Sequence, residues 1–508
     1  MFKDIKDGKM EVNKIYNMDV LEGLKNLEEN SVDSIVSDPP YQLSAINGSE
    51  GEKTKGFLGK EWDILPKVDV LKECLRVLKP GSFALWLMTP RQDSQMEFIL
   101  RLKEAGFVIS FSPVYWTYGT GFPKSENISR AVDKKLGYQR EVTAVDQNFG
   151  RAGLYGINET DKKISRRYTK PVSDEAKKLD GTYAGMSLKP AVEVIIVSMK
   201  PLSEKSYIEQ AIKNGKGITH IDDCRIPYVS DNDFEKRKRG IAKYDAEARH
   251  IYDRSRNKKE SFLFDTDAYH DKRGRFPANL LVSDGILDNG NITKSKQSVL
   301  GKGSNGGSGF FLTFKHEKGE ISGYNDEGDF SRFFSLDAWW ASRLKEFPKE
   351  LRDTFPFLYI PKPSVSERDM GLEKLELKSK WVQDEDDIEY DNGLPGMYRN
   401  NIMAKNSHPT VKPISLMAYL IALTTFENEV VLDPYIGSGT TAVSAIIMNR
   451  KYIGFEREKE YFEIINAKID FYNSKKGLFE RVKIKEEIMP TKNNINSIGM
   501  FLESEEEN

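Results

Sequence analysis

The stretch Asp38-Pro39-Pro40-Tyr41 combines residue types that could bind and orient an amine. Proline has no backbone N–H, so the carbonyl groups of this stretch and the Asp38 carboxylate are left as hydrogen-bond acceptors, and Tyr41 adds a ring face for stacking. Because it follows the strand-like run 32–36, the stretch is expected at the edge of a sheet. From these residues alone, a pocket for a flat amine and a simple strand-ending turn both remain open.

A second stretch near the C-terminus has the features of a ligand-binding turn. A predicted strand at 429–433 is followed by the turn 434–441, which contains Gly437 and Gly439, and by an apolar helix over 442–448. Glycines let the backbone approach a ligand closely, and the N-terminus of a helix attracts negative charge.

An acid follows the next strand of this unit. The predicted strand 452–455 ends at Glu456, roughly 20 residues past the glycines, where nucleotide-binding folds bind ribose hydroxyls. The turn lacks the spacing and the lysine of a P-loop, which argues against an NTPase. Strand, turn, helix, strand and acid together favour a nucleoside-containing cofactor over a purely structural turn.

Alternating strands and helices must position both stretches. Hydrophobic spacing predicts strands at 14–19, 32–36, 82–88 and 107–118, and helices around 21–27, 70–78 and 92–105. Such alternation is typical of an open α/β sheet. A strand at 191–199, in which Val192 and Val194 to Val197 are apolar and Glu193 is an acid, is interpreted as the last strand of the same sheet. We expect 57–63 to form a loop over the Asp38 edge, Asp33 to be a surface residue and Asp63 a loop residue.

Composition limits the class of protein. The chain has 508 residues, enough for two to four domains, and its 76 Lys plus Arg against 78 Asp plus Glu give no net basic charge. Cys74 and Cys224 have neither metal nor redox spacing, and no apolar run is long enough for a membrane span or a signal peptide. These features predict a reduced, cytoplasmic protein with no metal site and no membrane contact.

The block 201–405 differs in composition and is expected to be a separate, irregular domain. It contains a Gly/Ser-rich stretch at 301–309, an aromatic group at 330–340 and an acidic linker at 384–391. Its run 236–275 holds 13 Lys or Arg against 7 Asp or Glu, with aromatic residues between them. Such a mixture suits phosphate contacts and base stacking, although a solvated helical face explains any single charge equally well. The candidate DNA contacts are Lys236, Arg237, Lys238, Arg239, Arg254, Arg256, Lys258 and Lys259.

Three motifs, in this order, resemble those of a known enzyme family. They are Asp38-Pro39-Pro40-Tyr41, His408-Pro409-Thr410-Val411-Lys412-Pro413 and the run 433–441, and shorter blocks at 116–124, 274–280 and 331–334 also match. The chain thereby resembles bacterial and phage S-adenosylmethionine-dependent DNA amino-methyltransferases of the β class, in which the catalytic motif precedes the cofactor motif. Tyr435 stands where the family usually has Phe.

The resemblance implies an α/β fold of the Rossmann-like class I methyltransferase type: a mixed sheet, circularly permuted, with an inserted irregular target-recognition domain. It implies a catalytic half at 1–124, an insertion at 125–184, the last strand at 185–200, the target-recognition domain at 201–405, the cofactor-binding half at 406–472 and a polar tail at 473–508.

The resemblance also implies roles for individual residues. Asp433 and the backbone after it would hold the methionine portion of S-adenosylmethionine, Glu456 the ribose hydroxyls and Asp19 the adenine amine. Strands ending at Asp433, Glu456, Asp19 and Asp38, in this order, would be successive parallel strands with all four acids on one edge. His408 is expected to have no direct chemistry. The remaining implied cofactor contacts are Asp38, Pro434, Tyr435, Gly437, Ser438, Gly439, Thr440 and Thr441, with Thr410, Lys412 and Pro413 at the methionine end.

The implied reaction transfers a methyl group from S-adenosylmethionine to the exocyclic N6 amine of an adenine flipped out of duplex DNA. Asp38 and the Pro39 carbonyl would accept the amine hydrogens, which makes the amine more nucleophilic, and Tyr41 would stack on the base. The implied catalytic residues are Asp38, Pro39, Pro40 and Tyr41. No metal or cysteine nucleophile is needed, which argues against cytosine-C5 chemistry.

Several functional alternatives remain at this point. In the family, Asp at the first motif position usually accompanies adenine-N6 methylation and Ser cytosine-N4 methylation, so adenine is expected and cytosine-N4 is the alternative. An RNA adenine methyltransferase, a protein glutamine methyltransferase and a non-enzymatic DNA-binding protein are rival classes. Double-stranded DNA is the expected partner, a homodimer and a cognate restriction endonuclease are left open, and the recognition sequence cannot be read.

Overall fold

The computed structural model describes ten longer segments of the chain and a few short pieces. The longer segments are 10–42, 62–118, 126–146, 166–186, 191–228, 272–283, 330–347, 368–376, 403–408 and 410–475. The short pieces are 188, 251–253, 258–260, 287, 293–294, 298–299, 321–322, 327–328 and 378–379.

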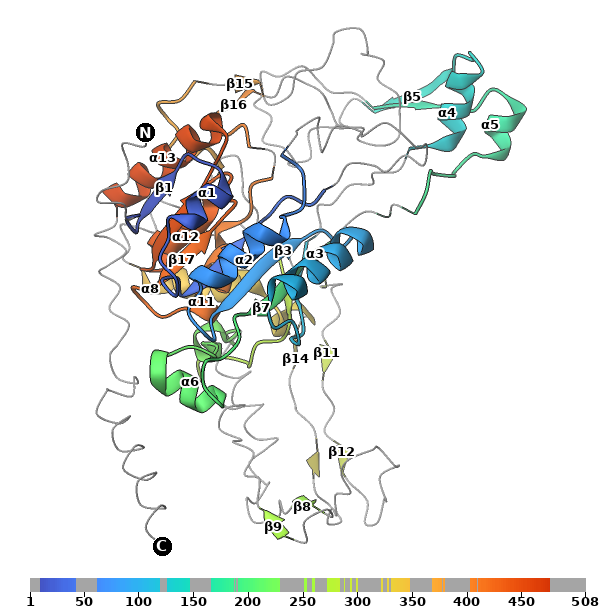
Figure 1. The fold of residues 1–508 in the computed structure, drawn as a ribbon. Coiled ribbons are helices and arrows are strands. Elements are labelled where there is room, and N and C mark those ends of the chain that lie inside the picture. The colour runs from blue at the N-terminus through green and yellow to red at the C-terminus, as the bar shows by residue number, and fades with distance from the viewer. Residues whose placement is uncertain are drawn as a thin grey trace, which may run out of the picture.

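An eight-stranded mixed sheet forms the centre of the fold, in the order β1-β18-β17-β2-β3-β7-β4-β10 (Figure 1). Its strands are β1 Lys14–Tyr16, β2 Ser34–Ser37, β3 Phe83–Met88, β4 Val114–Thr117, β7 Val192–Met199, β10 Leu280–Val282, β17 Val430–Asp433 and β18 Lys451–Phe455. Strand β7 runs antiparallel to both of its neighbours, and the other pairs are parallel. The carboxyl ends of the parallel strands therefore share one edge of the sheet with the beginning of β7.

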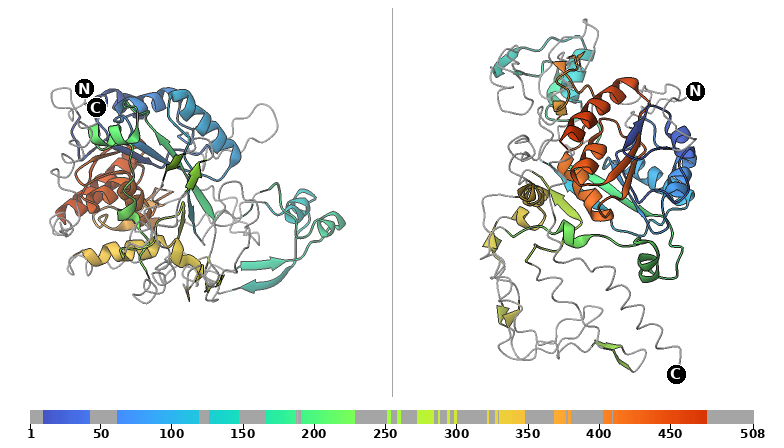
Figure 2. Two further views of the ribbon diagram at one scale, coloured as in Figure 1. Left: turned by 90° about the horizontal axis from the view of Figure 1, so that it is seen from below. Right: turned by 90° about the vertical axis from the view of Figure 1, so that its left-hand side faces the viewer.

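Helices cover both faces of this sheet (Figure 2). One face is covered by α1 Val20–Lys25, α2 Val68–Val77 and α3 Gln92–Ala105. The other is covered by α8 Leu336–Glu346, α11 Ile414–Thr424, α12 Thr440–Ile447 and α13 Lys459–Ser474. Alternate strand residues feed the two cores: Ile35 packs with the first group of helices and Val36 with the second. The fold is thus a three-layer α/β sandwich of the Rossmann-like type with a mixed sheet, as expected.

Local sequence explains where these elements begin and end. The Asp19 side chain accepts a hydrogen bond from the Leu21 N–H at 2.9 Å and caps α1. Helix α3 ends at Gly106, whose φ of 103° is a left-handed conformation that favours glycine. Helix α11 is buried almost all round, because it lies between α8 and α12 behind the sheet.

The structure corrects three expectations about the sheet. The predicted strand 107–118 is a strand only over β4, with Val108 bridging Met199. Strand β7 is not the last strand, because it is inserted between β3 and β4. The strands that lead to the four acids are neighbours, but β2, which leads to Asp38, pairs with β17 instead of β1. Direction and neighbours depend on long-range packing, which local periodicity does not report.

Part of the block 201–405 belongs to this central structure. Strand β10 pairs with β4 at the edge of the sheet, and α8 buries Trp339 and Trp340 against the α11 side. The block also contains α6 Tyr207–Asn214 and the short helices η2 Ile221–Cys224 and η5 Phe330–Phe333. Its other described strands form small two-stranded pairs: β8 Ile251–Asp253 with β9 Lys258–Glu260, β11 Thr293–Lys294 with β14 Glu327–Gly328, β12 Ser298–Val299 with β13 Ile321–Ser322, and β15 Lys378–Ser379 with β16 Met403–Ala404.

A small lobe within 126–186 lies apart from the sheet, at the upper right of Figure 1. It consists of α4 Ile128–Lys135, β5 Val142–Asp146, β6 Arg166–Thr169 and α5 Asp174–Lys178. Buried Asp133 organises it by accepting hydrogen bonds from Ser173 and Arg140. Although burial opposes the charged form, these donors hold the pKa of Asp133 well below its usual range.

Asp33 is buried at the opposite edge of the sheet from Asp38, so the expectation of a surface residue is wrong. Its carboxylate contacts Lys79 Nζ at 2.6 Å and Lys216 Nζ at 2.9 Å, and accepts the Val430 N–H at 3.0 Å. Burial opposes ionisation, but the two lysines outweigh it and lower the pKa of Asp33. The pairing ties β2 to β17 at the start of both strands. None of the helices in the described segments is long and apolar enough to cross a membrane.

Candidate active site

A cavity of about 400 Å³ opens at the carboxyl edge of the sheet. All four acids expected there line it: Asp19, Asp38, Asp433 and Glu456. The Asp38-Pro39-Pro40-Tyr41 stretch lies on one wall and the glycine turn on another, although these motifs are far apart in the sequence. The shared edge predicted for the four acids is therefore confirmed.

Asp38 lies in a compact cluster of ionisable side chains. Its Oδ2 accepts a hydrogen bond from Lys412 Nζ at 2.5 Å, and its Oδ1 accepts one from the Tyr41 hydroxyl at 2.5 Å. Glu193 completes the cluster, with its Oε2 3.6 Å from Lys412 Nζ and 3.5 Å from the Tyr41 hydroxyl. Two donors thus lie between two carboxylates, each closer to Asp38.

The cluster fixes the charge of Lys412. Burial alone would lower the pKa of Lys412, but the Asp38 and Glu193 carboxylates outweigh burial and raise it. Burial also raises the pKa of Glu193; Lys412 opposes this increase and Asp38 adds to it. The pKa of Tyr41 is raised by burial and by Asp38, so its hydroxyl stays protonated and donates.

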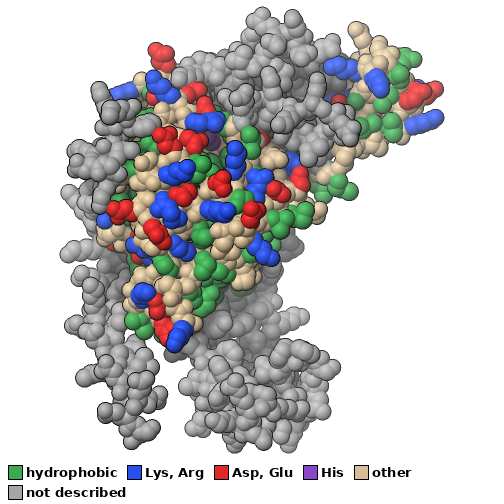
Figure 3. All heavy atoms as spheres, viewed as in Figure 1, with side chains coloured by type: hydrophobic (Ala, Val, Ile, Leu, Met, Phe, Trp, Pro, Cys, Tyr) green, Lys and Arg blue, Asp and Glu red, His purple; other side chains and the backbone are tan. Residues whose placement is uncertain are grey.

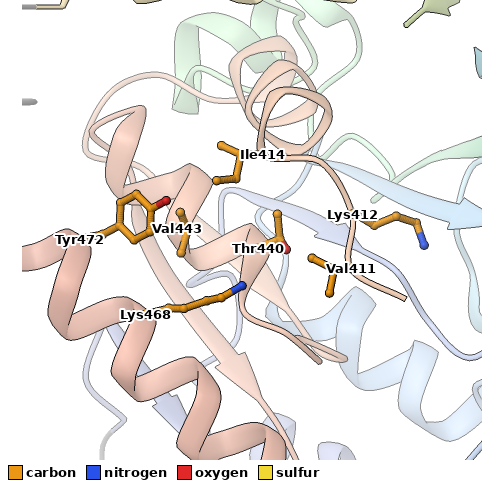
Figure 4. A pocket seen from close by; sticks show the side chains of 7 residues that line it. All are labelled: Val411, Lys412, Ile414, Thr440, Val443, Lys468 and Tyr472. Atoms are coloured by element: carbon orange, nitrogen blue, oxygen red, sulfur yellow. The ribbon is translucent and has the colours of Figure 1, made fainter. Parts of the chain in front are cut away.

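Lys412 lines the same cavity, so its expected place at the methionine end of a cofactor stays a prediction. Its ammonium group contacts Asp38, the acid of the first motif. Figure 4 shows its side chain extending away from a small crevice that Val443 and Tyr472 line. Of the two other residues predicted at the methionine end, Thr410 lines the main cavity and Pro413 is not among the residues that line it.

The glycine turn makes close backbone approach possible at two positions. Gly437 and Gly439 have φ values of 53° and 82°, in the left-handed region. A Cβ on Gly437 would lie 2.7 Å from His408 Nε2, so the turn is packed against this imidazole. His408 accepts the Thr410 N–H on Nδ1 at 3.3 Å and lines the cavity. The histidine supports the turn, which the sequence did not indicate.

Asp433 stabilises this turn through hydrogen bonds to its carboxylate. It accepts hydrogen bonds from the Ser37 hydroxyl at 2.6 Å, the Thr441 hydroxyl at 2.5 Å and the Tyr435 N–H at 3.0 Å. Burial raises its pKa to about 6, against the lowering effect of these three donors. Its carboxylate thereby connects the end of β17 to the last residue of β2 and to the first turn of α12.

Glu456 and Asp19 form the far end of the cavity. Glu456 follows β18, and its Oε1 accepts the Glu458 N–H at 2.7 Å. Burial raises its pKa to about 7. Asp19 is exposed, and its carboxylate is shared with the start of α1. Both acids keep acceptor capacity toward the cavity, since a carboxylate offers about four acceptor sites.

The residues after 61 form a further wall of the cavity, from Trp62 to Val70. The expected loop over the Asp38 edge is therefore present at Trp62 and Asp63, while 57–61 lie outside the described residues. Asp63 is buried and accepts the Gln42 N–H at 2.8 Å. It fixes the backbone directly after Tyr41.

The site residue that the sequence missed is Glu193. The sequence does contain a signal for it, because Glu193 is an acid among the apolar residues of a predicted strand. A charge is rarely buried without a partner, so such an acid indicates a partner of opposite charge or a hydrogen-bond donor. Its partners could not be named, because Lys412 and Tyr41 come from distant parts of the chain.

The expected DNA contacts are only partly within the described structure. Lys258 and Lys259 lie in the short strand β9, and the other six residues lie outside the described residues. Figure 3 shows Lys and Arg intermingled with Asp and Glu over the described part of the α1–α3 face. That face has the mixed character of an ordinary protein surface.

Comparison with known proteins gives short, clear similarities to curated methyltransferases. The chain is 40% identical over 60 residues to the type II methyltransferase M2.MboI of Moraxella bovis, covering 12% of this chain and 22% of that protein. It is 32% identical over 108 residues to the type II methyltransferase M.HpaI of Haemophilus parainfluenzae, covering 20% and 34%. The matched segments therefore span about a third or less of the length of these relatives.

Solved structures and a family model match over a longer range. The PvuII DNA methyltransferase (cytosine-N4-specific) aligns over 93% of both chains with 12% identity and a TM-score of 0.35. A putative DNA modification methylase of Thermus thermophilus, complexed with S-adenosyl-L-methionine, aligns over 90% of this chain and 95% of that chain, with 12% identity and a TM-score of 0.31. The model of the N6/N4 DNA methylase family matches residues 32–467, and the chain belongs to this family.

Proposed function

We propose that this chain is a site-specific DNA methyltransferase that methylates the N6 amine of a flipped-out adenine, with S-adenosylmethionine as methyl donor. The observation that supports it best is one cavity lined by both the Asp38-Pro39-Pro40-Tyr41 stretch and the glycine turn. Ser37, directly before the first motif, donates a hydrogen bond to Asp433, 396 positions away, at the start of the third motif, 433–441.

The cavity suits the cofactor on which this family depends. The packing of Gly437 against His408 leaves no room for a Cβ at this position. Gly437 therefore contributes only backbone atoms to the turn before α12. When bound, S-adenosylmethionine supplies a methyl group on a positively charged sulfur. Glu456 would accept hydrogen bonds from the ribose hydroxyls, and Asp19 would accept one from the adenine amine. The other proposed contacts are Asp38, Thr410, Lys412, Pro413, Asp433, Pro434, Tyr435, Gly437, Ser438, Gly439, Thr440 and Thr441.

Asp38 and Pro39 would prepare the target amine. The lone pair of an exocyclic amine is delocalised into the base, which makes it a poor nucleophile. By accepting the amine hydrogens, the Asp38 carboxylate and the Pro39 carbonyl favour the pyramidal, more nucleophilic form. Lys412 orients this carboxylate, because its ammonium group donates a hydrogen bond to Oδ2 at 2.5 Å. Asp38 accepts hydrogen bonds on both oxygens in this structure and would likewise act as an acceptor toward the amine.

The target base has to leave the duplex to reach this cavity. Flipping costs a few kcal/mol of stacking and pairing, and stacking on Tyr41 and contacts to the DNA backbone would offset it. The basic run 236–275 is the proposed source of phosphate contacts. Duplex DNA is therefore the proposed substrate.

Sequencing modified bases in DNA from cells that express the protein tests this proposal. We expect N6-methyladenine at one short sequence. An Asp38→Ala variant should leave the same DNA unmodified while it still binds S-adenosylmethionine in calorimetry. N4-methylcytosine at the site would make the choice of adenine wrong. If the wild-type protein binds S-adenosylmethionine but modifies structured RNA in preference to duplex DNA, the substrate is wrong.

A further inference from the structure

Glu193 is an acid at the beginning of β7, in a strand whose other central residues are apolar. Strand β7 is antiparallel, so its first residues lie at the edge where the parallel strands end. In the register, Glu193 lies opposite Trp116 of β4. Only 17% of its side chain is exposed. A carboxylate does not stabilise a strand, and burying its charge is costly without partners. The reason for an acid at this position is therefore sought in the contacts of its side chain.

Those contacts are with the same two donors that bind Asp38. The Tyr41 hydroxyl lies 2.5 Å from Asp38 Oδ1 and 3.5 Å from Glu193 Oε2. Lys412 Nζ lies 2.5 Å from Asp38 Oδ2 and 3.6 Å from the same Glu193 oxygen. A movement of about 1 Å or less would transfer either donor from a short contact with Asp38 to a good hydrogen bond with Glu193.

In this arrangement both oxygens of Asp38 already accept hydrogen bonds from protein side chains. One of its oxygens accepts from Tyr41 and the other from Lys412. An amine that binds to Oδ1 must share that oxygen with a phenol held at 2.5 Å, and both hydrogen bonds would be weakened. Lys412 can stay on Oδ2, where its hydrogen bond holds the carboxylate in place. Tyr41 is thus the donor that has to move.

We infer that Glu193 is a positioning residue that takes over the Tyr41 hydroxyl when the target amine binds to Asp38. The inference rests on the proposed function, because it requires an amine at Asp38. Before the amine arrives, the Tyr41 hydroxyl is hydrogen-bonded to Oδ1; afterwards, Glu193 holds the Tyr41 hydroxyl, and the amine no longer competes with it for Oδ1. No covalent bond changes in this step, and only hydrogen bonds are exchanged.

A double-mutant cycle between Glu193 and Tyr41 tests this transfer. Glu193→Met removes both oxygens at nearly constant length, and Tyr41→Phe removes the hydroxyl that would move. The measured quantity is the single-turnover rate of methyl transfer to duplex DNA that contains the modified sequence, at saturating S-adenosylmethionine. The S-adenosylmethionine Kd and the thermal unfolding midpoint are measured for every variant. Ser198→Ala, a buried hydroxyl deletion on the same strand, is the matched control for damage to β7.

We expect E193M to slow methyl transfer at least tenfold, with the S-adenosylmethionine Kd within twofold of wild type. In the Y41F background the same substitution should cost at least fivefold less, because the hydroxyl to be moved is missing. S198A should lower stability without this coupling. Glu193→Asp, which retracts the carboxylate by one methylene, should give an intermediate rate.

Two results would overturn the inference alone: an unchanged rate for E193M, or equal slowing in both backgrounds, which would mean that Glu193 acts through Lys412 or through the fold. If E193M does not fold, E193D takes its place in the same cycle and is judged by the same coupling. A wild-type protein that methylates neither base of duplex DNA would overturn the proposed function, and this inference with it.

Discussion

Lys412 Nζ lies 2.5 Å from Asp38 Oδ2, although the two residues are 374 positions apart in the chain. The contact joins the segment before α11 to the turn after β2. It places a buried ammonium group beside the proposed catalytic carboxylate, with Glu193 close to both. The ion pair therefore orients the carboxylate that would accept hydrogen bonds from the target amine.

Removing this ammonium group should impair catalysis more than cofactor binding. In Lys412→Met, Asp38 loses the hydrogen bond to Oδ2, and Asp38 and Glu193 lie close together without a cation between them. We expect the single-turnover rate to fall about 100-fold, within the range of such electrostatic contributions. Lys451→Met, on an exposed position of β18, is the control and should react at the wild-type rate. A normal rate for K412M would contradict this role.

Gly437 should not tolerate a side chain. In Gly437→Ala the new Cβ would meet His408 Nε2 at 2.7 Å, and a φ of 53° is strained for alanine. We expect S-adenosylmethionine to bind at least tenfold more weakly, as measured by calorimetry. Gly137→Ala is a matched control, because Gly137 has a φ of 78° with open space around it. Equal affinities in the two variants would contradict the proposed role of Gly437 in cofactor binding.

Cofactor affinity should depend on pH through Glu456. The pKa of this carboxyl is raised to about 7 by burial, so it is mostly ionised at pH 8 and mostly protonated at pH 6. If the ionised form accepts the ribose hydroxyls, the Kd should rise roughly tenfold from pH 8 to pH 6. The pKa of Asp433 is about 6, so Asp433 also contributes to the pH dependence. Comparing the wild type with Glu456→Gln separates the two, because Asp433 is present in both proteins. A pH dependence that persists unchanged in E456Q would rule out Glu456 as its source.

Asp433 should reduce stability at high pH. Its pKa in the folded protein is raised from the usual 3.8 to about 6, so the unfolded chain ionises first as pH rises. Stability contributed by the protonated carboxyl is complete below about pH 4 and is lost as pH rises through about 6, by about 3 kcal/mol. Asp433→Asn lacks this titration. The unfolding midpoint of D433N should therefore rise relative to wild type between pH 4 and pH 8, and a constant difference would contradict the argument.

Elements with a strong local pattern could be predicted from the sequence. The predicted helix 92–105 coincides with α3, and the strand predicted at 82–88 is β3 Phe83–Met88. The unit β17, turn, α12, β18 was also predicted, since apolar strands and a glycine turn have short-range signals. The prediction of four acids on one edge was correct for the same reason: each follows a strand or a strand-like run.

Features that depend on distant pairing could not be predicted. The position of β7 between β3 and β4 follows from packing across the whole sheet. Because β7 is antiparallel, Glu193 enters the site from the beginning of a strand, whereas the sequence argument looked only at strand ends. The burial of Asp33 has a similar origin, since its partner Lys216 comes from a distant loop.

The pairing of β2 with β17 also has a consequence for biosynthesis. Ser34 and Ile35 pair with Val431 and Leu432, so β2, which pairs with β3 on its other edge, meets β17 only after about 400 further residues have been made. Until then β2 has a free backbone edge, which invites pairing with other chains. Folding of the centre of the sheet is therefore a late event on the ribosome, and stalled chains of increasing length should gain protease resistance in one late step.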